Sequence, residues 1–267
     1  MTLRPPMARC RPGSTRRSSW LSERHLWKGG NRSGCLWTQQ RRRFRGDSMQ
    51  ATNGVLWDMD GVLVSTGEFH FQAWTKTLSA RAIPFSYEQF RTTFGMNNTG
   101  ILQTLLGEKV DPALLAEISE DKEENFRRAI QGKVQPLPGV LEWLKRLQDW
   151  GVRQAIASSA PSANIAVLMD ELGMRAFFDA VASGAALPGK PDPAVFLLAA
   201  RQIGVSPERC VVVEDAVAGV TAAKRGGMRC IAVTTTNPAH ELQDADIVVE
   251  RLDALPEDQF ARLFPEV

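Results

Sequence analysis

Residues 55 to 61 read Val-Leu-Trp-Asp-Met-Asp-Gly, an apolar run that ends in two carboxylates and a glycine. The apolar part contains a β-branched and an aromatic residue, which is typical of a buried strand. Asp-Gly is also a common turn dipeptide, so Asp58, Asp60 and Gly61 taken alone are compatible with a solvated turn. Only the remainder of the chain distinguishes a turn from a functional site.

Short β-rich runs alternate with helical patterns along most of the chain. The expected strands are 54–58, 152–158, 180–183, 210–214, 229–233 and 246–249. The expected helices between the later strands are 139–150, 162–172, 193–203 and 216–225. Strands that alternate with helices predict an α/β fold with a doubly wound parallel sheet.

One interval breaks this alternation, because residues 67–133 contain only helical patterns. Its expected helices are 68–79, 99–106 and 111–131. The interval interrupts the first crossover, so we predict a small helical cap domain inserted into a core domain made of 49–66 and 134–267. Ligands of open parallel sheets bind at the carboxyl ends of the strands, and an insertion after the first strand would cover that edge.

Charge is divided unevenly along the chain. Residues 1–48 hold 12 Lys and Arg against two acidic residues, a net charge of +10, while the remainder holds 20 basic and 28 acidic residues, or −8. The basic segment shows neither helical nor strand periodicity. Three interpretations stay open for it: a spurious extension upstream of Met49, an organelle transit peptide, or a functional basic arm.

Composition also bears on partners and location. No run is long and apolar enough to span a bilayer, and the acidic body disfavours a nucleic-acid surface outside residues 1–48. We expect a monomeric cytoplasmic protein, with organelle import if the basic segment is real. The cysteines lack zinc-ligand spacing and are expected to be reduced thiols.

Polar side chains follow four of the expected strands. In chain order they are Asp58 and Asp60, then Ser158, then Lys190, then Glu214 and Asp215. Because the carboxyl ends of parallel strands lie side by side, these groups should converge on one crevice. Each has an ordinary alternative role as a turn residue, helix cap or surface charge. Together they favour a phosphoryl site with a bound divalent cation.

Four motifs stand at these strand ends. They are Trp-Asp-Met-Asp-Gly-Val-Leu at 57–63, Ala-Ser-Ser at 157–159, Gly-Lys-Pro-Asp-Pro at 189–193, and Val-Glu-Asp-Ala-Val-Ala-Gly at 213–219. Their order resembles that of the haloacid dehalogenase superfamily over about residues 53–250, and the helical insertion resembles that of its β-phosphoglucomutase-like branch. The resemblance implies a Rossmann-like core, an inserted cap and phosphate ester chemistry.

The resemblance implies roles for the two aspartates of the first motif. Asp58 would be the nucleophile that forms an aspartyl-phosphate. Asp60 would protonate the leaving oxygen and later deprotonate the attacking water. Since a halide leaves unprotonated, an acid at position 60 favours phosphate esters over dehalogenation.

The resemblance further implies a Mg²⁺ site and a phosphate site. The candidate metal residues are Asp58, Asp60 through its carbonyl, Asp215 and Glu214. Ser158 would bind the transferred phosphate oxygens, while Lys190 would offset their charge and pair with an acid such as Glu214.

The candidate substrate-binding residues are Thr66, His70, Trp74, Asn97, Asn98 and Ser159. Residues 68–74 resemble the first cap helix of β-phosphoglucomutases, which implies that His70 and Trp74 face the cleft; packing between cap helices is the alternative. β-Phosphoglucomutases tend to have an arginine where Asn98 falls, which grips the distal phosphate of a bisphosphate. A neutral amide cannot replace that charge, which favours hydrolysis over mutase transfer. Turn formation and N-capping are the alternative roles of Asn97 and Asn98.

The sequence therefore predicts a Mg²⁺-dependent phosphatase that hydrolyses a small phosphorylated metabolite such as a sugar phosphate. The main alternative is a phosphosugar mutase. A phosphonate hydrolase would need a cap lysine, for which Lys76 is the candidate near the hinge. Nucleic-acid binding through residues 1–48 is a weaker alternative.

Overall fold

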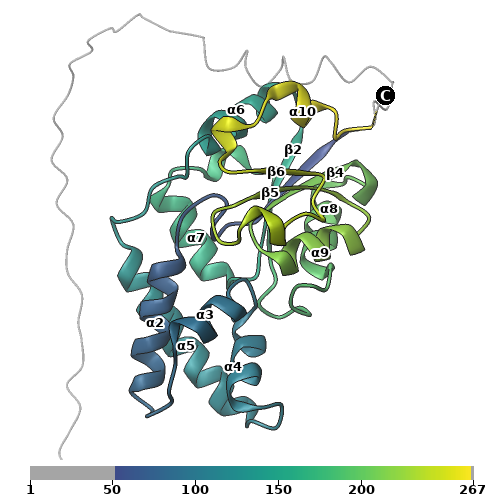
Figure 1. The fold of residues 1–267 in the computed structure, drawn as a ribbon. Coiled ribbons are helices and arrows are strands. Elements are labelled where there is room, and N and C mark those ends of the chain that lie inside the picture. Colours follow the sequence, from purple (N-terminus) through teal and green to yellow (C-terminus); the bar gives the residue numbers. More distant parts are fainter. Residues whose placement is uncertain (1–51, 266–267) are drawn as a thin grey trace, which may run out of the picture. The chain divides into compact units, whose positions relative to one another are not determined.

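The computed structural model describes residues 52–265, so the basic segment 1–48 and its three interpretations lie outside the described residues. Six strands form one parallel sheet in the order β3-β2-β1-β4-β5-β6 (Figure 1). They are β1 (Gly54–Trp57), β2 (Arg153–Ser158), β3 (Ala180–Ser183), β4 (Cys210–Glu214), β5 (Arg229–Val233) and β6 (Ile247–Val249). The sheet confirms the predicted α/β fold.

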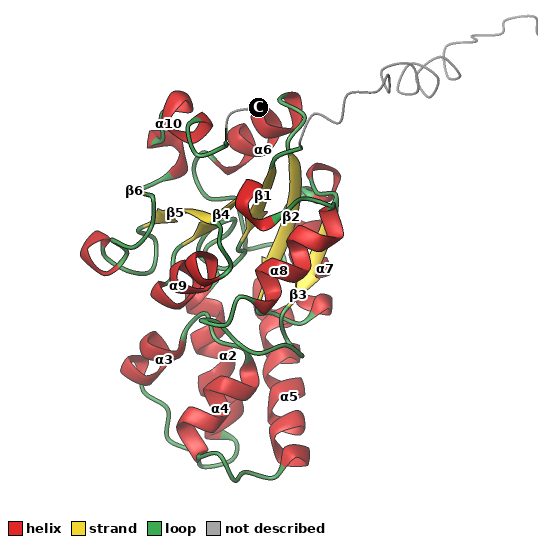
Figure 2. Cartoon of the chain, turned by 90° about the vertical axis from the view of Figure 1, so that its right-hand side faces the viewer, coloured by secondary structure: helices red, strands yellow, loops and turns green. Residues whose placement is uncertain are grey.

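The sheet is buried on both faces, as the continuous apolar runs of its strands require. Successive side chains of a strand point to opposite faces, so Val55 and Trp57 of β1 join one apolar cluster while Leu56 joins another. The helices that contribute most residues to the first cluster are α6 (Val140–Asp149) and α7 (Ser162–Glu171). Those that contribute to the second are α8 (Ala194–Ile203) and α9 (Val217–Arg225). Figure 2 shows both helices beside the sheet.

The strand order places a switch point beside β1. From β1 the chain builds β2 and β3 on one side of it, and then β4, β5 and β6 on the other. Trp57, the last residue of β1, pairs with Ile156 and with Val213. Residues just after Trp57 therefore lie level with the ends of β2 and β4, where open sheets of this type bind ligands.

Four helices separate β1 from α6. They are α2 (Gly67–Ser79), α3 (Tyr87–Thr93), α4 (Asn98–Leu106) and α5 (Pro112–Ile130). They lie together on one side of the sheet (Figures 1 and 2) and share an apolar cluster that includes Trp74 and Leu102. Between residues 52 and 265, no helix has the length and apolar character needed to cross a bilayer.

The expected elements agree with the observed ones to within one residue at each end, but two short α-helices were not predicted. One is α3, and the other is α10 (Glu257–Ala261). A local signal for α3 was present, because Ser86 and Gln89 form a capping box in which each side chain bonds the other's backbone amide. Helix α3 has only seven residues, too few for its hydrophobic period to be recognised from the sequence.

Candidate active site

Asp58 lies directly after the central strand and is almost fully buried. Its Oδ1 atom accepts a hydrogen bond from Lys190 Nζ at 2.5 Å, and the same ammonium donates to Glu214 Oε1 at 2.5 Å. Burial raises the pKa of Asp58 to about 7; Lys190 opposes this rise, while Glu214 and Asp60 add to it. Burial alone would lower the pKa of Lys190, but the charges of Asp58 and Glu214 raise it. Lys190 is therefore a cation shared by two carboxylates.

Both carboxylate oxygens of Glu214, one of the predicted metal ligands, accept hydrogen bonds from other groups of the protein. Oε1 accepts from Lys190, and Oε2 accepts from the backbone amides of Asp215 at 2.7 Å and Ala216 at 2.8 Å. These contacts hold the carboxylate against the start of the loop that leads to α9. These contacts suit Glu214 to orienting Lys190, and its role as a metal ligand stays a prediction.

Asp215 is the next residue and is also buried. Its Oδ2 atom accepts a hydrogen bond from Thr236 Oγ1, which the sequence analysis did not name. Thr236 follows β5, so the rule that strand ends converge on one edge applied to it as well. Gly61 packs against the same carboxylate, since a Cβ atom at Gly61 would lie 1.9 Å from Asp215 Oδ2.

Asp60 has a separate set of contacts. Its Oδ1 atom accepts from Thr66 Oγ1 at 2.5 Å and lies 3.2 Å from His70 Nε2. Lys122 Nζ lies 2.9 Å from His70 Nδ1, and because an ammonium only donates, Nδ1 accepts and Nε2 carries the hydrogen that points to Asp60. Burial and the charge of Lys122 lower the pKa of His70, in keeping with a neutral ring. Burial alone would raise the pKa of Asp60, but His70 and Thr66 lower it.

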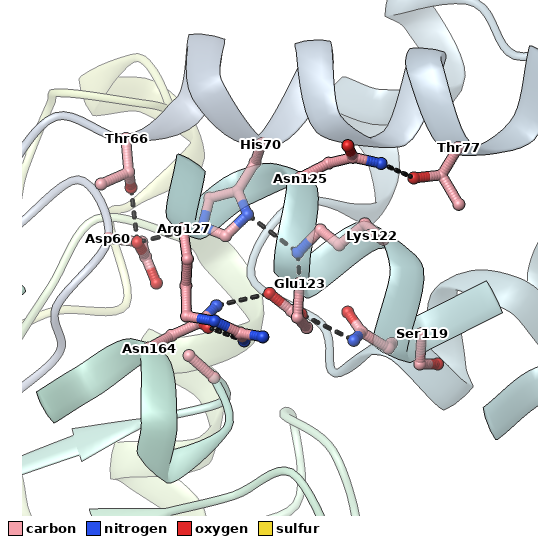
Figure 3. Close-up of polar contacts among 12 residues, drawn as sticks. Asp60, Thr66, His70, Thr77, Ser119, Lys122, Glu123, Asn125, Arg127 and Asn164 are labelled. Atoms are coloured by element: carbon pink, nitrogen blue, oxygen red, sulfur yellow. Dashed lines mark hydrogen bonds and ion pairs between the residues drawn. The ribbon is translucent and has the colours of Figure 1, made fainter. Parts of the chain in front are cut away.

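The polar contacts continue into α5, where the sequence analysis named no residue (Figure 3). Lys122 Nζ donates to Glu123 Oε1 at 2.9 Å, and both side chains are buried. Asn98 Nδ2 donates to the same oxygen at 2.7 Å, while Asn164 of α7 donates to Glu123 Oε2. Asn164 in turn accepts from Arg127 at 2.9 Å. One hydrogen-bonded series thus runs from Asp60 to a helix on the core.

A sequence signal for Lys122 existed. Ile118, Lys122, Phe126 and Ile130 repeat every four residues and form the buried stripe of α5, so a lysine occupies a core-facing position. All four residues at 121–124 are charged, which is typical of an exposed part of a helix, and the sequence analysis did not single out Lys122. Lys76, the lysine considered from the sequence, is exposed.

A small cavity lies between the sheet end and helices α2, α4 and α5. It offers about 40 Å³ to a water-sized sphere, which is room for a few waters and not for a whole sugar phosphate. Among the predicted site residues, those that line it are Asp58, Asp60, His70, Trp74, Asn98 and Ser159. Movement of the helices away from the sheet would make room for a larger substrate.

Two of the predicted residues that do not line this cavity, Ser158 and Asn97, make contacts within the protein. Ser158 is buried, and its Oγ accepts from the Ala160 amide at 3.1 Å. Asn97 caps α4 by accepting from the Gly100 amide at 2.9 Å, and it donates to the Leu187 carbonyl at 3.0 Å. The capping role that the sequence left open for Asn97 is therefore the one observed.

The charge balance around Asp58 fits a divalent cation. Burial and the charges of neighbouring carboxylates raise the pKa of Asp215, as burial does that of Asp58. An oxygen-seeking cation such as Mg²⁺ would offset this excess negative charge. Among residues 52–265, no three His, Cys, Asp or Glu side chains are arranged to hold a metal ion by themselves. A site here would combine Asp58 and Asp215 with the Asp60 carbonyl and water.

Comparison with known proteins places this geometry in a family. The model of the haloacid dehalogenase-like hydrolases matches residues 52–227. β-Phosphoglucomutase of Bacillus subtilis is 32% identical over 210 residues, which cover 75% of this chain and 90% of the relative. Fructose-1-phosphate phosphatase of Escherichia coli is 33% identical over 186 residues, which cover 67% of this chain and 95% of the relative.

A plant relative and a solved structure agree with these matches. The chloroplastic 5-amino-6-(5-phospho-D-ribitylamino)uracil phosphatase of Arabidopsis thaliana is 31% identical over 205 residues, or 76% of this chain, but this chain spans only 55% of that relative. CbbY of Rhodobacter sphaeroides, in complex with xylulose-(1,5)bisphosphate, superposes with a TM-score of 0.69 at 26% identity, covering 76% of this chain and 96% of that one. The chain therefore belongs to the haloacid dehalogenase-like hydrolase family, in its β-phosphoglucomutase-like branch.

Proposed function

We propose that this enzyme is a Mg²⁺-dependent phosphatase that hydrolyses a small phosphorylated metabolite, of the sugar phosphate kind, through an aspartyl-phosphate on Asp58. One observation carries the proposal: two carboxylates two residues apart have different partners. Asp58 is paired with Lys190, while Asp60 is held by Thr66 and His70. Relatives named as phosphatases of fructose 1-phosphate and of a ribitylamino-uracil phosphate support it.

In the proposed first step, an Asp58 oxygen attacks phosphorus while the bond from phosphorus to the leaving oxygen breaks. Lys190 holds the attacking carboxylate and offsets the charge of the phosphate oxygens. When bound by Asp58, Asp215 and the Asp60 carbonyl, Mg²⁺ would neutralise phosphate charge that otherwise repels an anionic nucleophile.

Asp60 would serve both halves of the reaction. Its lowered pKa makes it a carboxylate at rest, the form that removes a proton from the water that attacks the aspartyl-phosphate. In the first half it has to carry a proton to the leaving oxygen. A phosphomonoester, whose second pKa is about 6, can bring that proton into the site.

Thr236 is expected to position Asp215, so Thr236→Val should lower kcat about 10- to 100-fold and raise the Mg²⁺ concentration needed for half-maximal rate. The variant removes the hydroxyl that donates to the Asp215 carboxylate while keeping the side-chain shape. Hydrogen bonds to charged groups contribute about 1.5–3 kcal/mol, which gives that range. The measurement is phosphate release during a Mg²⁺ titration. Thr235→Val, on the exposed neighbouring threonine, should behave as wild type.

The proposal is tested by supplying a panel of phosphorylated metabolites with and without Mg²⁺. The panel includes β-glucose 1-phosphate with a trace of glucose 1,6-bisphosphate, because a mutase would convert it to glucose 6-phosphate. We expect Mg²⁺-dependent release of inorganic phosphate and no glucose 6-phosphate. Isomerisation without net phosphate release would establish the mutase alternative in place of hydrolysis.

A further inference from the structure

Glu123 places a carboxylate in the cavity wall, away from the reacting carboxylates. Three successive contacts separate it from Asp60, through His70 and Lys122 (Figure 3). It lines the same cavity as Asp58 and Asp60, although it comes from α5. Its side chain is only 6% exposed. The wall of the cavity opposite the strand end therefore contains an acid.

The contacts of Glu123 keep it in place and leave it one acceptor position. A carboxylate has about four lone-pair sites. Lys122 and Asn98 use two on Oε1, and Asn164 uses one on Oε2. One position on Oε2 is left for a donor such as a substrate hydroxyl. Although burial would raise the pKa of Glu123, the charge of Lys122 lowers it.

The charges of this wall cancel. Lys122 is the only ammonium or guanidinium among the described residues that line the cavity, and it is paired with Glu123. A phosphate group needs unpaired positive charge or several free N–H donors. Lys190, which contacts Asp58, would offset the charge of the transferred phosphate. A second phosphate at the opposite wall would meet a carboxylate and a lysine whose charge is already neutralised.

We infer that Glu123, with Asn98 beside it, selects phosphate monoesters that carry hydroxyl groups at the end remote from the transferred phosphate, and rejects bisphosphates. The inference rests on the proposed phosphatase function and adds the chemical class of its substrate. It distinguishes this chain from the superposed CbbY, whose crystal structure holds a bisphosphate. Glu123 and Asn98 are specificity-determining residues and take no part in bond making.

The test compares kcat/KM for matched esters that differ only in a second phosphate. The pairs are fructose 1-phosphate with fructose 1,6-bisphosphate, and glucose 6-phosphate with glucose 1,6-bisphosphate. For wild type we expect the monophosphate to be preferred at least 100-fold. Glu123→Gln removes the carboxylate charge and leaves Lys122 unneutralised, so the ratio of bisphosphate to monophosphate activity should rise at least 10-fold.

Two further variants complete the test. Glu124→Gln makes the same charge change on the next residue, whose exposed side chain pairs with Arg128, and its ratio should stay within twofold of wild type. Asn98→Lys adds a cation to the cavity wall and leaves Glu123 in place. It should raise the ratio of bisphosphate to monophosphate activity, and it serves as the test if Glu123→Gln does not fold.

The two proposals fail in different ways. The selection by Glu123 is overturned if the wild type hydrolyses a bisphosphate as efficiently as the matching monophosphate. It is also overturned if the ratio of bisphosphate to monophosphate activity does not rise in the folded variants at positions 123 and 98. The proposed phosphatase function stands in both cases. If no ester of either kind releases phosphate, the proposed function is overturned and this inference with it.

Discussion

Replacing Asp58 by asparagine is expected to lower kcat for phosphate release by at least about 10⁴-fold, because an amide cannot form the covalent bond to phosphorus. Asparagine has the shape of aspartate, and its oxygen can still accept from Lys190. The measurement is steady-state phosphate release at saturating Mg²⁺. Acid quenching during turnover of a ³²P-labelled ester should leave label on wild-type protein and none on the variant.

Folding is the control for this variant. The site buries three carboxylates, those of Asp58, Glu214 and Asp215. Lys190 is the cation beside them and contacts Asp58 and Glu214. Removing one negative charge from this group relieves repulsion, so the midpoint of thermal unfolding should be unchanged or higher. A folded Asp58→Asn protein with undiminished turnover would mean that Asp58 is not the nucleophile.

Gly61→Ala is expected to lower kcat at least about 100-fold and to reduce the free energy of unfolding by about 2–4 kcal/mol. Gly61 has φ +88°, a left-handed conformation that alanine adopts only with strain. An added Cβ would also lie 1.9 Å from Asp215 Oδ2 and 3.0 Å from Thr236 Oγ1. Either the loop or the carboxylate has to move. Both effects are measured by phosphate release and by urea unfolding.

A second glycine separates backbone strain from displacement of Asp215. Gly151 also has a positive φ, +72°, but a Cβ there would meet nothing within 4 Å. Gly151→Ala should therefore cost about 1 kcal/mol of stability and leave kcat unchanged. Equal losses of kcat in the two variants would show that the contact between Gly61 and Asp215 has no catalytic importance.

Local sequence patterns were enough to predict that the residues at the centre of the site lie together. The apolar runs of β1, β2 and β4 predict buried strands, and their alternation with helices predicts a parallel sheet. Parallel strands end at one edge, which is why Asp58, Lys190 and Glu214 could be grouped before their 2.5 Å contacts were seen. The partner of Asp215 was missed although it follows β5 at the same edge, since a run of three threonines does not indicate which hydroxyl points inward.

The sequence by itself determined the sheet, the inserted helices and the carboxylates at the strand ends, because strand and helix periods are local properties of the chain. Only the tertiary structure decided which side chains of the inserted helices reach that edge. Lys122 meets His70 across 52 residues, and Glu123 meets Asn164 across 41. The buried stripe of α5 indicates that Lys122 faces the core. Which residue it contacts depends on how α2, α5 and α7 pack against each other, and the pattern of one helix does not determine that packing.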